Sequence, residues 1–364
     1  KHTHEAWATI LDAEAIQLGA SSGRDGLSLS MMVLKEVLPA GLDAFSEALL
    51  APGWSSERFA LIKENTISAA RKSLEEPGVR ASEATSRLLF PGHPYGHRPD
   101  GNPASLKKIL LADLKKLYVN QIRPEGAVLA VSGDITMPEL LKLLQPLLAD
   151  WKGAPEQQLF EISRADDVHG ITKQIEMQTS QTLSQLSRLG PARRDADFFP
   201  VFVLNHILGG GGFGSRLMQE VREKRGLVYG IYSYFIPLAT SGPFIITLQT
   251  RADQAEEAEN VVRTVLQELF SGEITRKELK DAKANLTGSF AQRMDSNRER
   301  VGLMSMIGFY GMPLDYLQVW TQKVESVTLT DIKIAANAYL DPKQWNLLRV
   351  GPKAGVEAGG ETAP

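Results

Sequence analysis

The stretch LNHILGGGGFGSRLMQEVREKRGLVYGIYSYF, residues 204–235, is the most informative segment of this chain. Four consecutive glycines give its backbone the freedom to turn sharply: Gly209, Gly210, Gly211 and Gly212. Helix-forming residues follow at 215–224, with Leu217 and Val221 on one stripe, so the pattern predicts a helix there.

The same stretch brings an arginine and a tyrosine close to each other across the end of that helix. Gly226 is a natural helix stop, and residues 227–235 read as a strand. Arg222 therefore lies on the last helical turn and Tyr229 near the start of the strand, seven residues later. A guanidinium and a phenol that point into one cleft can hold a peptide carbonyl or the tetrahedral anion formed from it.

Length and composition limit the classes of protein to which the chain can belong. At 364 residues it exceeds what a single core usually organises, so two or more domains are expected. Its 40 basic and 43 acidic residues give a net charge of -3, which argues against nucleic acid or an anionic membrane as a partner. The lack of cysteine excludes disulfides and thiolate chemistry, and no apolar run approaches the roughly 18 residues of a membrane span.

Two halves of the chain repeat one order of predicted elements. In the first half these are a strand at residues 27–34, helices at 42–50 and 57–74, and a closing strand at 127–132. In the second half they are a strand at 243–250, helices at 253–270 and 275–294, and a closing strand at 345–350. A repeat of this length indicates duplication of a whole domain.

We therefore expect two homologous α+β domains, residues 1–152 and 171–364, joined by a polar linker at residues 153–170. The small, polar tail after Pro352 is expected to be frayed. Because Lys1 opens inside a helical pattern without an initiating methionine or a capping residue, a further segment upstream of it is also expected.

The six histidines predict no metal site. The segment from His2 to Ala6, HTHEA, comes within one residue of the inverted zinc motif H-x-x-E-H but ends in alanine. Moreover, His2 and His4 would lie about 200° apart around a helix and could not clamp one ion. The remaining histidines lie in a turn-rich loop, in the linker and on an apolar run, respectively: His93 and His97, His169, and His206.

The glycine run also has a nucleotide-binding alternative. It lacks the Lys-Ser/Thr pair that closes a phosphate loop, and it follows a helix-like segment at residues 198–208 where a dinucleotide fold needs a strand. A structural turn that can meet an extended peptide is the better interpretation.

Several segments together resemble the pitrilysin or insulinase-type zinc peptidases, a family that includes the mitochondrial processing peptidase and the core subunits of respiratory complex III. The segments are LGGGGFGSRLMQEVREKRGLVYGIYSYF, IQLGASSGRDGLSLSMMVL, LFPGHPYGHRPDG and AVLAVSGDI. The resemblance extends over residues 14–351. It implies two duplicated α+β domains, each with a mixed sheet backed by helices, which face each other like a clam-shell across a closed chamber.

The resemblance also implies that this chain holds no zinc. In the family, H-x-x-E-H lies on a first-domain helix upstream of the region where this chain begins, and a glutamate on a later helix completes the site. With Pro77-Gly78 set against the same turn in active relatives, that glutamate position falls at Ser68-Ala69. Neither residue binds zinc well, and Glu64 is a weak substitute one turn away.

Some members of the family are split into two chains, and the zinc-free chain donates an Arg/Tyr pair to its partner's active site. By this resemblance the chain is the non-zinc-binding subunit of a heterodimeric zinc peptidase, with Arg222 and Tyr229 as the donated pair and the glycine run along the peptide. Two alternatives stay open: a structural assembly subunit, and a self-sufficient zinc peptidase that lacks its N-terminal part here. The habit of the family places the protein in a bacterial periplasm or cytoplasm.

Overall fold

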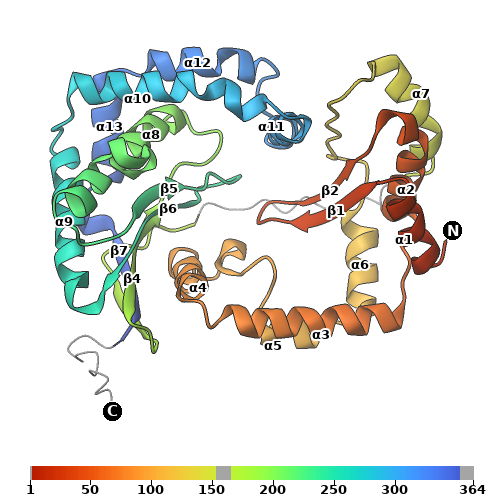
Figure 1. Cartoon of the computed structure of the whole chain (residues 1–364), viewed down its shortest axis with the longest axis horizontal. Coiled ribbons are helices and arrows are strands. Elements are labelled where there is room, and N and C mark those ends of the chain that lie inside the picture. Colours follow the sequence, from red (N-terminus) through yellow and green to blue (C-terminus); the bar gives the residue numbers. More distant parts are fainter. Residues whose placement is uncertain (1, 153–164, 353–364) are drawn as a thin grey trace. The chain divides into compact units, whose positions relative to one another are not determined.

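The described part of the chain forms two separate sheets together with many helices (Figure 1). The structure is a computed structural model, and it describes residues 2–152 and 165–352. Its strands are β1 (Gln17–Ser22), β2 (Leu27–Met32), β3 (Thr172–Glu176), β4 (Gln181–Leu189), β5 (Ile231–Phe235), β6 (Pro243–Arg251) and β7 (Asn346–Gly351). Parallel and antiparallel strand pairs occur together with many helices, which confirms the predicted α+β class.

Helices lie at or near the predicted ranges 42–50, 57–74 and 253–270, and the structure contains others besides. They are α1 (His4–Ala13), α2 (Leu38–Leu50), α3 (Ser56–Ser73), α4 (Pro77–Leu89), α5 (Pro103–Lys108), α6 (Leu111–Gln121), α7 (Met137–Leu148), α8 (Phe198–Asn205), α9 (Ala255–Phe270), α10 (Arg276–Gly288), α11 (Asn297–Phe309), α12 (Tyr316–Ser326) and α13 (Leu329–Tyr339). None of these helices is long and apolar enough to cross a bilayer.

The chain forms two compact units from discontinuous segments. Unit 1 contains Lys1–Arg71, Pro99–Glu161 and Met294–Gly311, and unit 2 contains Lys72–Arg98, Ile162–Arg293 and Met312–Pro364. Helix α4 thus belongs to unit 2 and α11 to unit 1. The domain boundaries at residues 152 and 171, the duplication and the clam-shell arrangement stay predictions. Most of the predicted linker and the tail lie outside the described residues.

Unit 2 is built on a five-stranded sheet in the order β3-β7-β4-β6-β5. Successive side chains on a strand point to opposite faces, and the central strand β4 is covered on both. On one face Ser184 donates a hydrogen bond to Glu259 of α9 at 2.6 Å. On the other, Gln185 donates to Thr85 of α4 at 3.1 Å. These polar residues are therefore buried with partners, and β4 has no solvent face despite its polar sequence.

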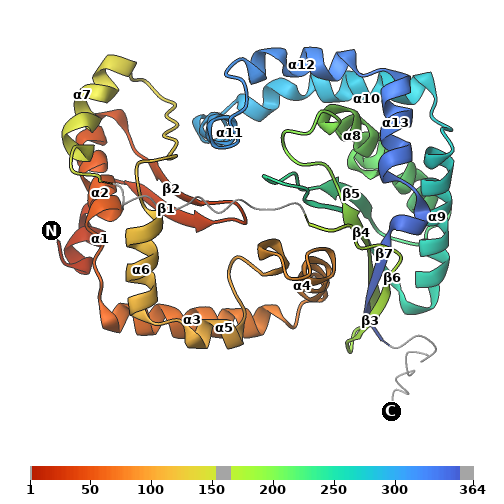
Figure 2. The ribbon, with the colours of Figure 1, turned by 180° about the vertical axis from the view of Figure 1, so that it is seen from behind.

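Strand β5 lies at the edge of this sheet, where it pairs antiparallel with β6. Ile231 and Ser233 are buried on one face, and Tyr232 and Tyr234 are exposed on the other. Figure 2 shows the same edge from behind. The strand therefore follows the alternation expected of a half-buried edge.

Unit 1 has a smaller core between helices α2 and α7. Leu42, Leu140 and Leu144 are buried together, and Met31 of β2 packs against them. The only sheet among the described residues of this unit is the antiparallel pair β1–β2.

Two predicted elements differ in the structure. Residues 127–132 form no strand, because no described segment pairs with their backbone groups; Val128 instead packs closely against Gly308 of α11. The long helix predicted at 275–294 ends at Gly288, and a 3-10 turn, η7 (Phe290–Met294), follows it. There the ring of Phe290 stacks on Trp320 at 4.4 Å between centroids, a tertiary contact that helix periodicity does not reveal.

Candidate functional site

The glycine run begins inside one π-helical turn and ends before a second. Helix α8 continues into the π-helix η3 (His206–Gly210), a 3-10 turn η4 (Gly212–Gly214) follows, and a second π-helix η5 (Met218–Glu223) comes next. The α-helix predicted at 215–224 is therefore of the wrong type, since Lys224 donates its backbone N–H to Gln219 five residues back, at 3.0 Å. Such turns are rare and occur often at functional sites.

Close packing explains the glycines better than flexibility does. A Cβ atom on Gly209 would lie 2.6 Å from the hydroxyl of Ser233 and 2.7 Å from its backbone nitrogen. On Gly210 or Gly211 it would lie 2.6 Å from the Asn205 amide or the His206 carbonyl, respectively. The first three glycines thus let η3 approach β5 and its own preceding turn.

Replacing Gly209 by alanine is expected to destabilise the protein by roughly 1–3 kcal/mol, the usual cost of overpacking against a backbone that cannot move freely. Gly214 provides a matched control, because no atom lies within 4 Å of a Cβ built there. Denaturant unfolding of the two alanine variants measures the difference. Equal denaturation midpoints for the two variants would show that a methyl group at position 209 does not disturb the packing of η3 on β5.

An ion-pair network fixes the start of the second π-helix. The guanidinium of Arg216 lies 2.6 Å from Glu278 of α10, and Arg216 also contacts the backbone carbonyl of Glu273. Glu278 in turn accepts the backbone N–H of Thr275 at 2.8 Å and so caps α10. Arg216 was not among the residues that the sequence singled out, and it anchors the segment on which the arginine/tyrosine pair depends.

The Glu278 contacts predict a pH dependence of stability. Burial opposes ionisation, but hydrogen bonds from Arg216 and Thr275 outweigh it and lower the pKa of Glu278 to about 2, from 4.5. A lowered pKa in the folded state contributes stability above pH 4.5 that is lost as the pH falls toward 2. The melting temperature of wild type should therefore exceed that of Glu278→Gln at pH 7, and the gap should close between pH 4.5 and 2. A gap that does not depend on pH would contradict this.

Arg222 and Tyr229 lie close together, in a cation–π contact. The guanidinium carbon of Arg222 lies 5.0 Å from the ring centroid of Tyr229, within cation–π range. It also lies 4.8 Å from the ring centroid of Phe213, a residue that sequence reasoning missed. In the sequence, the only feature that marks Phe213 is that it is an aromatic residue between two glycines.

Tyr229 is open to solvent, and Arg222 is partly so. Tyr229 is 88% exposed, the Arg222 side chain is 27% exposed, and within the described part of the chain neither the hydroxyl nor the guanidinium makes a hydrogen bond. Arg222 lies 3.5 Å from Glu223 through Nε, a partly exposed ion pair that contributes little. The hydroxyl of Tyr229 and the terminal N–H groups of Arg222 thus have no hydrogen-bond partner among the described residues.

The chain between the two residues is held by backbone contacts. Gly226 has φ of 63° and donates its N–H to the Arg222 carbonyl at 2.8 Å, which turns the chain out of the π-helix. The hydroxyl of Thr250 then binds the carbonyl of Leu227. The strand predicted from residue 227 starts only at Ile231, so Tyr229 lies on a short connector and not in the sheet.

The first half of the chain has a similar turn but not the pair. Ala15 has φ of 50° and is followed by a buried aliphatic residue, Ile16, as Gly226 is followed by Leu227. Four residues before and three residues after the turn, where the second half carries arginine and tyrosine, the first half has Leu11 and Leu18. The candidate chemistry is therefore restricted to unit 2.

The histidines make structural contacts. His2 bonds to Glu47 at 2.8 Å, and His93 accepts the backbone N–H of Tyr95 at 3.1 Å. Burial lowers the pKa of His206, and nearby Arg293 lowers it further. Across residues 2–152 and 165–352, no three His, Asp or Glu side chains gather in a way that could hold a metal ion.

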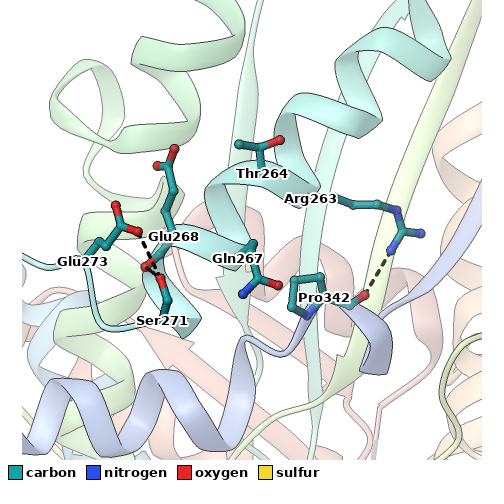
Figure 3. Close-up of a pocket in the computed structure, with 7 residues that line it drawn as sticks. All are labelled: Arg263, Thr264, Gln267, Glu268, Ser271, Glu273 and Pro342. Atoms are coloured by element: carbon teal, nitrogen blue, oxygen red, sulfur yellow. Dashed lines mark hydrogen bonds between the residues drawn. The ribbon is translucent and has the colours of Figure 1, made fainter.

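A shallow pocket of about 350 Å³ lies elsewhere in unit 2, between α9 and the turn η8 (Pro342–Gln344) (Figure 3). Its lining residues are Arg263, Thr264, Gln267, Glu268, Ser271, Glu273 and Pro342. Arg263 already donates to the Pro342 carbonyl at 3.0 Å, and none of the predicted site residues lines the pocket. It carries no candidate chemistry.

Comparisons with known proteins assign the family. Residues 108–286 match the family described as Peptidase M16 inactive domain. A crystal structure of a peptidase M16 inactive domain from Pseudomonas fluorescens is 32% identical with a TM-score of 0.91, and the match covers 98% of this chain and 85% of that one. Fold and sequence thus define a peptidase-like chain. The chain belongs to the peptidase M16 family, which confirms the resemblance seen in the sequence.

Relatives carry names of two kinds. A protein of Helicobacter pylori (strain ATCC 700392 / 26695) named "Non-peptidase homolog YmxG" is 26% identical over 341 residues, which cover 92% of this chain and 77% of that protein. An uncharacterized zinc protease of Mycobacterium bovis (strain ATCC BAA-935 / AF2122/97) is 23% identical over 352 residues, which cover 95% of this chain and 79% of that protein. A protein named as a zinc protease and one named as a non-peptidase are thus both similar to this chain over most of its length.

Proposed function

We propose that this chain is the zinc-free subunit of a two-chain zinc peptidase, in which Arg222 and Tyr229 complete the active site of a homologous zinc-bearing partner. The observation that supports this most directly is the pair itself: the two side chains lie in cation–π contact, Tyr229 is exposed and Arg222 is half-buried, and neither makes a hydrogen bond within the described residues. A chain of the inactive-domain kind has no evident need for such a pair unless it acts on another chain's substrate.

In this proposal the pair acts on the peptide carbonyl under attack. Zinc held by the partner supplies an activated water. The phenol of Tyr229 donates a hydrogen bond to the oxygen on which negative charge develops, and donors of this type stabilise the transition state more than the ground state. The N–H groups of Arg222 hold the adjacent backbone carbonyl of the peptide.

The substrate fits as an extended peptide beside the glycine run and β5. Gly210, Gly211 and Gly212 reach the surface next to Phe213, whereas Gly209 is buried and contributes packing. Backbone without side chains allows a peptide to approach closely. An extended peptide bound along a domain edge uses its main chain for affinity.

One reconstitution experiment distinguishes the zinc-free subunit, the structural subunit and the self-sufficient peptidase. It uses a zinc-bearing M16 chain from the same organism as the partner. The proposal predicts that neither chain cleaves a quenched fluorescent peptide alone, that the mixture does, and that the purified complex holds one zinc per heterodimer. A stable complex without turnover would instead support a structural subunit. Zinc binding and turnover by this chain alone, with any upstream sequence restored, would support a self-sufficient peptidase.

The proposed cellular location rests on the relatives. Because the relatives are bacterial and the habit of the family points the same way, a bacterial periplasm or cytoplasm is favoured. The partner must be in the same compartment.

A further inference from the structure

Phe213 has an unusual position for a large apolar side chain. It is 64% exposed, it has a glycine on each side, and it lies over the guanidinium of Arg222 at 4.8 Å. An exposed phenylalanine gains little from burial, so packing of the core does not account for it.

The turn that carries Phe213 is fixed from within the protein. Ser215 is fully buried, and both its backbone N–H, at 3.0 Å, and its hydroxyl, at 2.7 Å, donate to the carbonyl of Gly212. Gly212 has φ of 60°, which sets the direction in which the turn leaves the run. Two hydrogen bonds from one buried serine thus hold the short turn η4 at both ends, with Phe213 at its centre.

The side chain of Tyr229 is not fixed by a hydrogen bond of its own. Tyr229 is 88% exposed, and the hydroxyl at its tip has no partner within the described part of the chain. Arg222 has several rotatable bonds, and its Nε lies 3.5 Å from Glu223. Phe213 directly follows the Gly212 carbonyl that Ser215 holds, whereas the Leu227 carbonyl that Thr250 holds lies two residues before Tyr229.

Two aromatic rings lie within cation–π range of one guanidinium, at 4.8 and 5.0 Å from its central carbon. A cation–π contact does not consume the N–H groups of arginine, which stay able to donate. The two contacts therefore limit the positions that the guanidinium of Arg222 takes before any peptide binds.

We infer that Phe213 is a positioning residue that holds Arg222, and through Arg222 the ring of Tyr229, in the geometry that binds the peptide. This inference rests on the function proposed above for the pair. Under this inference, the glycine run also holds the aromatic ring of Phe213 in a fixed position.

The first test needs no partner chain. Ring currents shift the resonances of a guanidinium stacked on aromatic faces, so the Nε–H signal of Arg222 in the folded chain, labelled with ¹⁵N-arginine, should lie upfield. Phe213→Leu should remove a large part of that shift, and Phe213→Trp should keep it. An Arg222 signal that is the same in wild type and Phe213→Leu would overturn the stacking.

The second test measures turnover in the reconstituted complex. Phe213→Leu should lower kcat/KM by roughly two- to fivefold, which corresponds to one exposed cation–π contact, and Phe213→Trp should restore it. In an Arg222→Ala background, Phe213→Leu should have no further effect, because the two residues act as one unit. A merely structural role would give the same loss in both backgrounds and would overturn the inference.

The experiments distinguish failure of the Phe213 inference from failure of the proposed function. If Phe213→Leu changes the Arg222 signal but not turnover, while Arg222→Ala abolishes turnover, the role of Phe213 is wrong and the proposed function stands. If Arg222→Ala leaves turnover of the complex unchanged, the proposed function itself fails.

Discussion

Tyr229→Phe is expected to lower the turnover of the reconstituted peptidase by about 10²–10³-fold while the complex stays intact. The substitution removes one hydroxyl, and loss of a single donor to a developing oxyanion typically costs roughly 3–4 kcal/mol of transition-state stabilisation. Because the Tyr229 hydroxyl has no partner within the described part of the chain and its ring is 88% exposed, folding should be unaffected. The loss should therefore appear in kcat more than in KM.

Arg222→Ala should produce a loss of similar size, with a larger share in KM, because its N–H groups hold the peptide before and during reaction. Matched controls lie in the same segment. Tyr232→Phe removes the hydroxyl of another exposed tyrosine, and Arg225→Ala removes an arginine that pairs with Glu220 at 2.8 Å. Both controls should retain turnover. Full activity in Tyr229→Phe and Arg222→Ala would remove the basis for any catalytic contribution from this chain.

Glu259→Ala is expected to give the largest loss of stability, roughly 3 kcal/mol. The carboxylate of Glu259 is 2% exposed, and it accepts hydrogen bonds from Arg349 of β7 and from Ser184 of β4. It thus links α9 to two neighbouring strands of the sheet. Removing it leaves Arg349 without its partner, and because that side chain keeps 26% exposure, the loss should fall at the low end for buried ion pairs.

Two further variants isolate the contribution of the Glu259–Arg349 ion pair. Glu257→Ala removes an exposed carboxylate from the same turn of α9 and should change the stability by less than about 0.5 kcal/mol. Replacing Glu259 and Arg349 together by methionine should recover much of the loss, since no charge is then left unpaired. Denaturant unfolding of the variants measures these differences. A Glu259→Ala midpoint equal to that of Glu257→Ala would show that the ion pair does not stabilise the sheet.

Sequence patterns predicted several helices of this fold for a simple physical reason. In α3 and α9 the apolar spacing and the terminal residues act over a few turns, so local sequence is sufficient: α3 was expected at 57–74 and is Ser56–Ser73, and α9 was expected at 253–270 and is Ala255–Phe270. The strand at 127–132 failed because pairing depends on a distant segment, which a local alternation cannot supply. The helix at 275–294 ended early because Phe290 packs on Trp320, far away in sequence.

For the candidate site, the sequence by itself determined the residue types. Arginine seven residues before tyrosine, after a glycine run and across a helix end, was sufficient to select Arg222 and Tyr229, since a glycine stop fixes where a helix can end. Tertiary structure decided the rest: π-helical turns instead of an α-helix, the ring of Phe213 beside the guanidinium of Arg222, and the anchoring of Arg216 on Glu278. These depend on contacts between residues far apart in sequence or on a wider hydrogen-bond ring, and neither leaves a periodic signal in the chain.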